Sequence, residues 1–154
     1  MKPADPSADP RDAAGRAPTP TRVLVVDDDP GIRRMIRRVL ERNGCEVAEV
    51  SDGRRALEHY RAHPPDVAFV DLILPGLDGA AVMREIRAEY PAAHLVAMSG
   101  ATHLGGLEVS STARRAGADE FLAKPLWPHT ILAAVHARRP PIEAGSLPDA
   151  AEEA

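Results

Sequence analysis

The chain has 154 residues, enough for one domain with a full core, and its apolar content of 44% and charged content of 27% are ordinary for a globular protein. The formal net charge of −4 gives no attraction to nucleic acid or anionic membranes. No apolar run approaches the roughly 20 residues of a membrane helix, and no secretory signal opens the sequence. Because Cys45 is the single cysteine, an internal disulfide is excluded and a reducing compartment fits, so we expect a cytoplasmic protein.

Both ends of the sequence are expected to be disordered arms. Residues 1–21 are rich in Pro, Ala and Asp, and residues 139–154 combine prolines and a glycine with an acidic end. Neither segment shows apolar periodicity, so neither buries enough apolar surface to offset the entropy lost on ordering. We therefore predict one folded domain over residues 22–138.

The first part of this domain predicts two strand–helix pairs. A short apolar strand, Val23–Val26, stops at three aspartates and is followed by a helix whose apolar residues recur at helical spacing over residues 32–40. Arginines take the opposite face of that helix, which we expect to be a solvated face, with docking of a kinase helix as the alternative. A second strand, Glu46–Val50, precedes a helix around residues 56–60 that two prolines end.

One pair of side chains on this second helix needs a separate interpretation. His59 and His63 are four residues apart, so they share one helix face and could bind a metal ion. A solvated helix face explains the same spacing, and we expect that simpler arrangement.

Three further strand–helix pairs follow. The predicted strands are Val67–Val70, which ends at Asp71, Leu95–Met98, which ends at Ser99, and Glu120–Leu122, which ends near Lys124. The predicted helices lie around residues 82–86, 113–116 and 131–135. Continuous apolar strands indicate burial on both faces, so the sequence predicts an α/β fold with a doubly wound parallel sheet and helices on both faces.

Polar residues gather at one edge of this predicted sheet. Asp27 and Asp28 follow the first strand, and Asp71, Ser99 and Lys124 follow the third, fourth and fifth strands. The carboxyl ends of parallel strands are where such sheets bind ligands. Three carboxylates repel one another, and one lysine cannot neutralise them, so a hard divalent cation such as Mg²⁺ is the natural remedy.

The motifs at these strand ends resemble those of a known family. The segments Val25–Asp29, Val70–Gly79, Met98–Gly100 and Lys124–Pro125 are similar, in this order and spacing, to the motifs of receiver domains of two-component response regulators. The resemblance covers roughly residues 22–137. It implies a flavodoxin-like, five-stranded parallel sheet of order 2-1-3-4-5.

The resemblance also implies a phosphoryl-transfer site. Asp71 would be the phosphoacceptor, Asp28 a direct ligand of Mg²⁺, and Asp27 an acid that acts largely through water. The backbone carbonyl of Ile73 would be a further metal ligand, and Mn²⁺ could replace Mg²⁺.

Further roles follow from the same resemblance. Ser99 and Lys124 would hold the phosphoryl oxygens, the Lys124–Pro125 peptide bond would be cis, and Phe121 matches the aromatic residue whose orientation reports the active state. Ile73 and Ala101 occupy positions that flank the path of the attacking water. Neither side chain can hydrogen-bond that water, so we predict a long-lived phosphoryl group.

The expected partners are those of a stand-alone receiver similar to the chemotaxis regulators. A sensor histidine kinase or a phosphotransfer protein would supply the phosphoryl group. The receiver would then relay it, form a phosphorylation-dependent homodimer, or bind a target protein, with no direct contact to nucleic acid or membrane. It would catalyse only its own phosphorylation and dephosphorylation. No output domain is expected after the last helix, and the segment between Ser99 and Lys124 is slightly longer around residues 103–106 than in compact receivers.

Two other functions start from the same residues. Asp27 and Asp29 formally provide the D-x-D motif of haloacid-dehalogenase-type phosphatases, but Asp71 on the third strand and the lack of a cap domain argue against that class. A pseudo-receiver that is never phosphorylated is the second alternative. The complete set of five polar residues argues against it.

Overall fold

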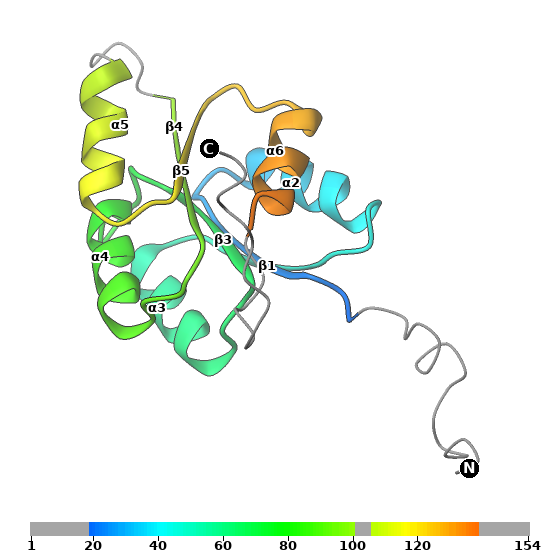
Figure 1. Ribbon diagram of the computed structural model, residues 1–154, viewed down its shortest axis with the longest axis horizontal. Coiled ribbons are helices and arrows are strands. Elements are labelled where there is room, and N and C mark those ends of the chain that lie inside the picture. Colours follow the sequence, from blue (N-terminus) through cyan, green and yellow to red (C-terminus); the bar gives the residue numbers. More distant parts are fainter. Residues whose placement is uncertain (1–18, 101–105, 139–154) are drawn as a thin grey trace, which may run out of the picture.

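The computed structural model describes residues 19–100 and 106–138 and shows one sheet between two layers of helices (Figure 1). The strands are β1 (Arg22–Val26), β2 (Glu46–Val50), β3 (Val67–Asp71), β4 (Leu95–Ser99) and β5 (Glu120–Ala123). The helices are α2 (Pro30–Glu41), α3 (Gly53–Ala62), α4 (Gly79–Glu89), α5 (Gly106–Arg115) and α6 (Pro128–His136). All neighbouring strands are parallel in the order β2-β1-β3-β4-β5, so the predicted doubly wound sheet and its strand order are confirmed.

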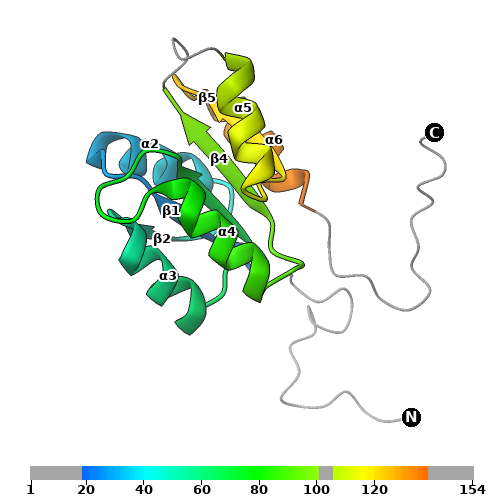
Figure 2. The same cartoon turned by 90° about the vertical axis from the view of Figure 1, so that its left-hand side faces the viewer.

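The helices divide between the two faces of the sheet. In Figure 1, α2 and α6 lie on one side, and α3, α4 and α5 lie on the other, which Figure 2 turns toward the viewer. Side chains of β1 alternate between these layers: Val23 and Val25 pack with residues of α2 and α6, whereas Leu24 and Val26 pack with residues of α3 and α4. Burial on both faces explains why the central strands are apolar at every position except the one polar residue at an end of each, Arg22 in β1, Asp71 in β3 and Ser99 in β4.

Helix starts differ from the prediction by a few residues. The apolar pattern indicated a helix over residues 32–40, but α2 begins at Pro30, because Asp29 caps it and accepts a hydrogen bond from the backbone N of Gly31. Proline at the first helical position needs no hydrogen-bond partner, so it favours this start. The helix predicted around residues 113–116 is longer and begins at Gly106.

The edge strand β5 also differs from the inner strands. Its side chains are half-buried or exposed, whereas every residue of β3 and β4 is buried. An edge strand has a neighbour on one side only, which leaves part of its surface open.

Several predictions fall on residues outside this description. They concern most of the two terminal arms, Ala101, and the longer segment around residues 103–106, of which only the start of α5 is described. Among the described helices, none has both the length and the apolar character that crossing a bilayer requires.

Candidate functional site

The polar residues predicted at the strand ends do meet at the carboxyl edge of the sheet. Lys124, which follows β5, places its Nζ 2.7 Å from Oδ2 of Asp27 and 2.7 Å from Oδ2 of Asp71. Asp27 is fully buried and Asp71 is 5% exposed, whereas Asp28 is open to solvent. One oxygen from each of the three carboxylates lies within 4.8 Å of the others.

Backbone groups fix the orientation of the two buried carboxylates. The backbone N of Ile73 donates to Oδ1 of Asp71 at 2.9 Å, and the backbone N of Asp29 donates to Oδ1 of Asp27 at 2.9 Å. Each carboxylate therefore has one oxygen bound by the backbone and the other by Lys124. Such pairing offsets part of the cost of burying a charge.

Arg33 is a supporting residue that the sequence analysis missed. Its Nη1 donates to the backbone carbonyl of Asp27 at 2.7 Å, and its Nε pairs with Glu49 of β2 at 3.0 Å. The expectation that the arginines of α2 are simply solvated is therefore wrong for Arg33. Arg37 of the same helix is also half-buried and pairs with Glu49 at 2.6 Å, whereas Arg34 and Arg38 are exposed, and the sequence alone did not distinguish these arginines.

The burial of these charges changes their proton affinities. Burial raises the pKa of Asp71, and the Asp27 carboxylate adds to the increase, while hydrogen bonds from Lys124 and the Ile73 backbone oppose it. Burial alone would lower the pKa of Lys124, but hydrogen bonds to Asp27 and Asp71 outweigh it and raise that pKa. Lys124 is therefore a fixed positive charge at neutral pH, and the carboxylates exceed it in number.

Gly79 allows the backbone of β3 to pass close beneath α4. A Cβ at this position would overlap the carbonyl oxygen of Asp71 and crowd Cα of Leu72, and the backbone N of Gly79 donates to the Leu72 carbonyl at 3.0 Å. Asp78 caps α4 by accepting from the backbone N of Ala81. Gly79 was not among the predicted site residues, although its place directly after the capping residue Asp78 marks a helix start.

The remaining predicted residues lie at different distances from this cluster. Ser99 is buried at the end of β4, and its carbonyl accepts from the backbone N of Lys124 at 2.9 Å. The Lys124–Pro125 peptide bond is cis, as predicted. Phe121 is half-buried and packs with the core on the α3, α4 and α5 side, and Ile73 is 60% exposed.

The donor set suits a hard divalent cation. Lys124 offsets only one of the three carboxylate charges, and the candidate ligands are all oxygens, which Mg²⁺ prefers. Asp29, which the D-x-D alternative requires, instead caps α2 with its side chain. The exposed Asp28 also lines a surface hollow of about 540 Å³. The other lining residues are Ser51, Asp52, Arg54, Pro75 and Gly76.

Comparison with known proteins decides which family has this arrangement. The sequence model of one protein family, the response regulator receiver domain, matches residues 23–136 of this chain. This chain belongs to the response regulator receiver domain family. Receiver domains are signalling modules that are phosphorylated on an aspartate and bind Mg²⁺ in an acidic pocket. The membership favours the receiver interpretation over the phosphatase alternative.

Receiver domains of two kinds are among its relatives. The chain is 34% identical over 116 residues to the chemotaxis protein CheY of Bacillus subtilis, covering 75% of this chain and 94% of that protein. It is 38% identical over 120 residues to the DNA-binding response regulator MtrA of Mycolicibacterium smegmatis, covering 76% of this chain but 50% of that protein. The chain therefore spans nearly all of the first relative and half of the second.

Solved receiver structures agree with the fold. A putative response regulator from Chloroflexus aurantiacus matches with a TM-score of 0.72 at 28% identity, covering 77% of this chain and 97% of that structure. The signal receiver domain of the putative response regulator NarL from Mycobacterium tuberculosis matches with a TM-score of 0.69 at 35% identity. The match covers 78% of this chain and 96% of that structure.

Proposed function

We propose that this receiver accepts a phosphoryl group on Asp71 from a sensor histidine kinase or a phosphotransfer protein and signals through the resulting change in shape. The observation that carries the proposal is the position of Lys124 Nζ, 2.7 Å from both Asp27 and Asp71. It marks the point where three carboxylates and one fixed cation converge at a single edge of the sheet.

The proposed transfer uses the Asp71 carboxylate as nucleophile. A carboxylate oxygen forms a bond to the phosphorus of a phosphohistidine, the P–N bond breaks, and the electron pair leaves with the imidazole nitrogen, which takes up a proton. The product is an acyl phosphate. Lys124 remains protonated throughout and stabilises charge on the phosphoryl oxygens.

The proposed Mg²⁺ ligands are carboxylates and one backbone carbonyl. Asp28, Asp71 and the Ile73 carbonyl would bind the ion directly, and Asp27 would act largely through water. When bound, Mg²⁺ neutralises carboxylate charge and so reduces the repulsion between Asp71 and an incoming phosphoryl group. Mn²⁺ also prefers oxygen ligands and would substitute.

The proposed switch depends on Ser99 and Phe121. Lys124 already contacts Asp71 before phosphorylation, so its bond differs little between the two states. The Ser99 hydroxyl would form a new hydrogen bond to the phosphoryl group, worth about 1.5–3 kcal/mol. Because a shift from 1:99 to 99:1 needs about 5.5 kcal/mol, we expect a partial population shift that partner binding completes, with Phe121 changing orientation.

We further propose that output occurs in the cytoplasm through contact with a target protein, a phosphorelay partner or a second copy, as a single-domain regulator. Support comes from the chemotaxis protein CheY, nearly all of which the chain spans. The DNA-binding regulators in the same family make a DNA-linked output the competing arrangement.

Phosphorylation by acetyl phosphate tests the proposed acceptor. Wild-type protein should gain the mass of one phosphoryl group in the presence of Mg²⁺ and none in the presence of EDTA. Asp71→Asn should gain none, while Asp66→Asn, a control at the opposite edge of the sheet, should behave as wild type. Absence of a Mg²⁺-dependent adduct with both acetyl phosphate and phosphohistidine donors would overturn the proposal.

A further inference from the structure

We propose that His59 and His63 of α3 form a second metal site, which binds a divalent transition cation such as Zn²⁺, Ni²⁺ or Cu²⁺ independently of the acidic site. The two rings come from the far end of α3. That helix begins at Gly53, close to the carboxyl edge of the sheet, and runs back toward the opposite edge. The proposed site is therefore separate from Asp27, Asp28 and Asp71.

The separation of the two rings matches that needed to share one ion. Their centres are 5.3 Å apart, and their planes are inclined at 50°. A Zn–N bond of about 2.0–2.1 Å places each ring centre about 3.2 Å from the ion, and two rings at a tetrahedral angle then have centres about 5.2 Å apart. The observed separation of the ring centres is therefore compatible with one shared ion.

The helix backbone holds the two histidines at this spacing. His63 is the C-cap residue of α3, and its backbone N donates to the carbonyl of His59 at 2.8 Å. His59 lies one turn before His63, but the backbone of His63 (φ −141°, ψ 75°) is outside the helical region, so the pair differs from the two regularly helical histidines of an H-E-x-x-H zinc helix. The hydrogen bond between the two backbones keeps the residues close together.

The surroundings of His59 differ from those of a solvated side chain. Its ring is half-buried, and its Nδ1 is buried without a hydrogen-bond partner among the described residues. The solvated face expected from the sequence is correct for His63, which is exposed, but wrong for His59. A buried nitrogen without a hydrogen-bond partner is unfavourable, so a ligand that pairs with this nitrogen would be favoured.

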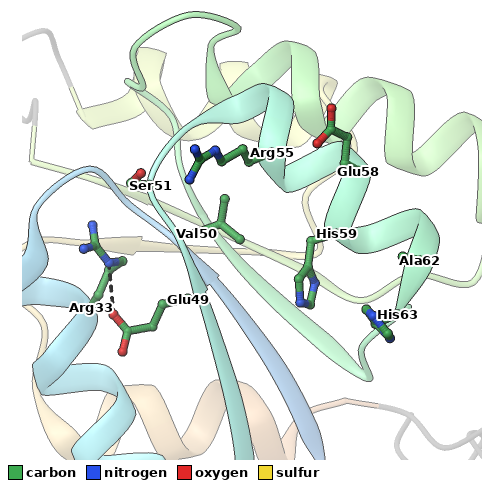
Figure 3. Close-up of a pocket in the computed structure, with 9 residues that line it drawn as sticks. All are labelled: Arg33, Glu49, Val50, Ser51, Arg55, Glu58, His59, Ala62 and His63. Atoms are coloured by element: carbon green, nitrogen blue, oxygen red, sulfur yellow. Dashed lines mark hydrogen bonds and ion pairs between the residues drawn. The ribbon is translucent and has the colours of Figure 1, made fainter.

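Both histidines line a groove between α3 and β2, drawn in Figure 3. The groove has a volume of about 520 Å³, enough for an ion with its water molecules or an external ligand. Glu49, a carboxylate of β2 that lines this groove, is held by Arg33 and Arg37 at 3.0 and 2.6 Å. Glu46 of β2 lines a neighbouring hollow together with both histidines, so this carboxylate, water or an exogenous ligand would complete the coordination. The other lining residues are Val50, Ser51, Arg55, Glu58 and Ala62.

The donor type selects the class of metal. Imidazole nitrogen suits Zn²⁺, Ni²⁺ and Cu²⁺, whereas Mg²⁺ prefers oxygen, so the two sites of the molecule would sort their ions by ligand chemistry. Burial, His63 and the nearby Arg22 all lower the pKa of His59, so this ring is neutral and able to coordinate at neutral pH. We expect Cu²⁺ to bind most tightly.

Titration of the untagged full chain with Ni²⁺ in excess Mg²⁺ tests this site, because Mg²⁺ keeps the acidic site filled. In ¹H–¹⁵N spectra, paramagnetic broadening should appear first at amides of α3 and β2, with saturable binding. His59→Gln and His63→Gln should each weaken binding by about tenfold or more, since a single ring loses the benefit of two linked ligands. Zn²⁺ should raise the thermal midpoint of wild type and of neither variant.

His129→Gln and His136→Gln, both exposed on α6, are matched controls and should bind Ni²⁺ as wild type does. Thermal midpoints without metal establish that each variant is folded. Broadening centred on the acidic site, unchanged affinity in both His59→Gln and His63→Gln, or absence of saturable binding would each overturn the proposal.

Discussion

Asp71 is held in the folded protein at a cost in stability. Its raised pKa means that folding disfavours the ionised carboxylate relative to the unfolded chain, so at neutral pH this charge lowers the free energy of unfolding. Asp71→Asn should therefore raise the thermal midpoint in EDTA, on the order of a few degrees. The difference should shrink as the pH falls through the raised pKa, because Asp71 then becomes neutral in the wild type.

Mg²⁺ should change the thermal midpoints of the wild type and of Asp71→Asn by different amounts. It should stabilise the wild type by offsetting the carboxylate repulsion, and it should stabilise Asp71→Asn much less. Thermal unfolding of both proteins between pH 4 and 8, with and without Mg²⁺, provides the measurement. A lower midpoint for Asp71→Asn in EDTA at neutral pH would show that the pairing with Lys124 outweighs the burial of charge.

We propose that Ile73 helps to set the lifetime of the phosphoryl group. Its side chain is 60% exposed beside Asp71 and cannot position a water molecule by hydrogen bonding. Replacing it with Asn or Glu should accelerate acyl-phosphate decay by about tenfold, the effect of roughly 1.4 kcal/mol of added hydrogen bonding in the transition state. Ile73→Ala is the matched control and should have little effect. Marked acceleration by Ala but not by Asn or Glu would show that side-chain bulk, rather than missing hydrogen bonding, slows hydrolysis.

At the scale of elements, the junction between β3 and α4 depends on Gly79. Gly79→Ala should lower the free energy of unfolding by about 1–3 kcal/mol, because the added methyl group meets backbone atoms of Asp71 and Leu72 that cannot rotate away. Gly100→Ala is a suitable control, since its Cβ would lie 3.7 Å from the nearest described atoms, which belong to the Lys124 side chain. Guanidinium unfolding compares the two variants. Equal midpoints for Gly79→Ala and wild type would contradict the close approach.

The elements themselves were largely predictable, for a specific reason. Buried parallel strands are apolar at every position, so β1 and β3 stand out as runs that stop abruptly at aspartates. The bounds of the helices were less predictable, because apolar spacing marks only the buried face. The start of α2 depends on Asp29 and Pro30, which lie outside that pattern.

For the whole molecule, the sequence located the site but not its internal contacts. Topology brings Asp27, Asp71 and Lys124 to one edge, and this followed from the strand ends alone. Asp27 is buried and the adjacent Asp28 is exposed. This difference depends on the path of the chain between β1 and α2. The contact from Arg33 to the Asp27 carbonyl and the half-buried ring of His59 depend on packing between helices and β2, which no local pattern records.

The most direct test of the account is to locate the phosphoryl group on the chain. Protein phosphorylated with Mg²⁺ and a phosphohistidine donor can be reduced with borohydride, which converts an aspartyl phosphate to homoserine, and then analysed by peptide mass spectrometry. If Asp71 is the acceptor, it should be the single converted residue, and no conversion should occur when Mg²⁺ is removed. Conversion at Asp27 or Asp28 instead, or a phosphoryl group on a histidine, would contradict it.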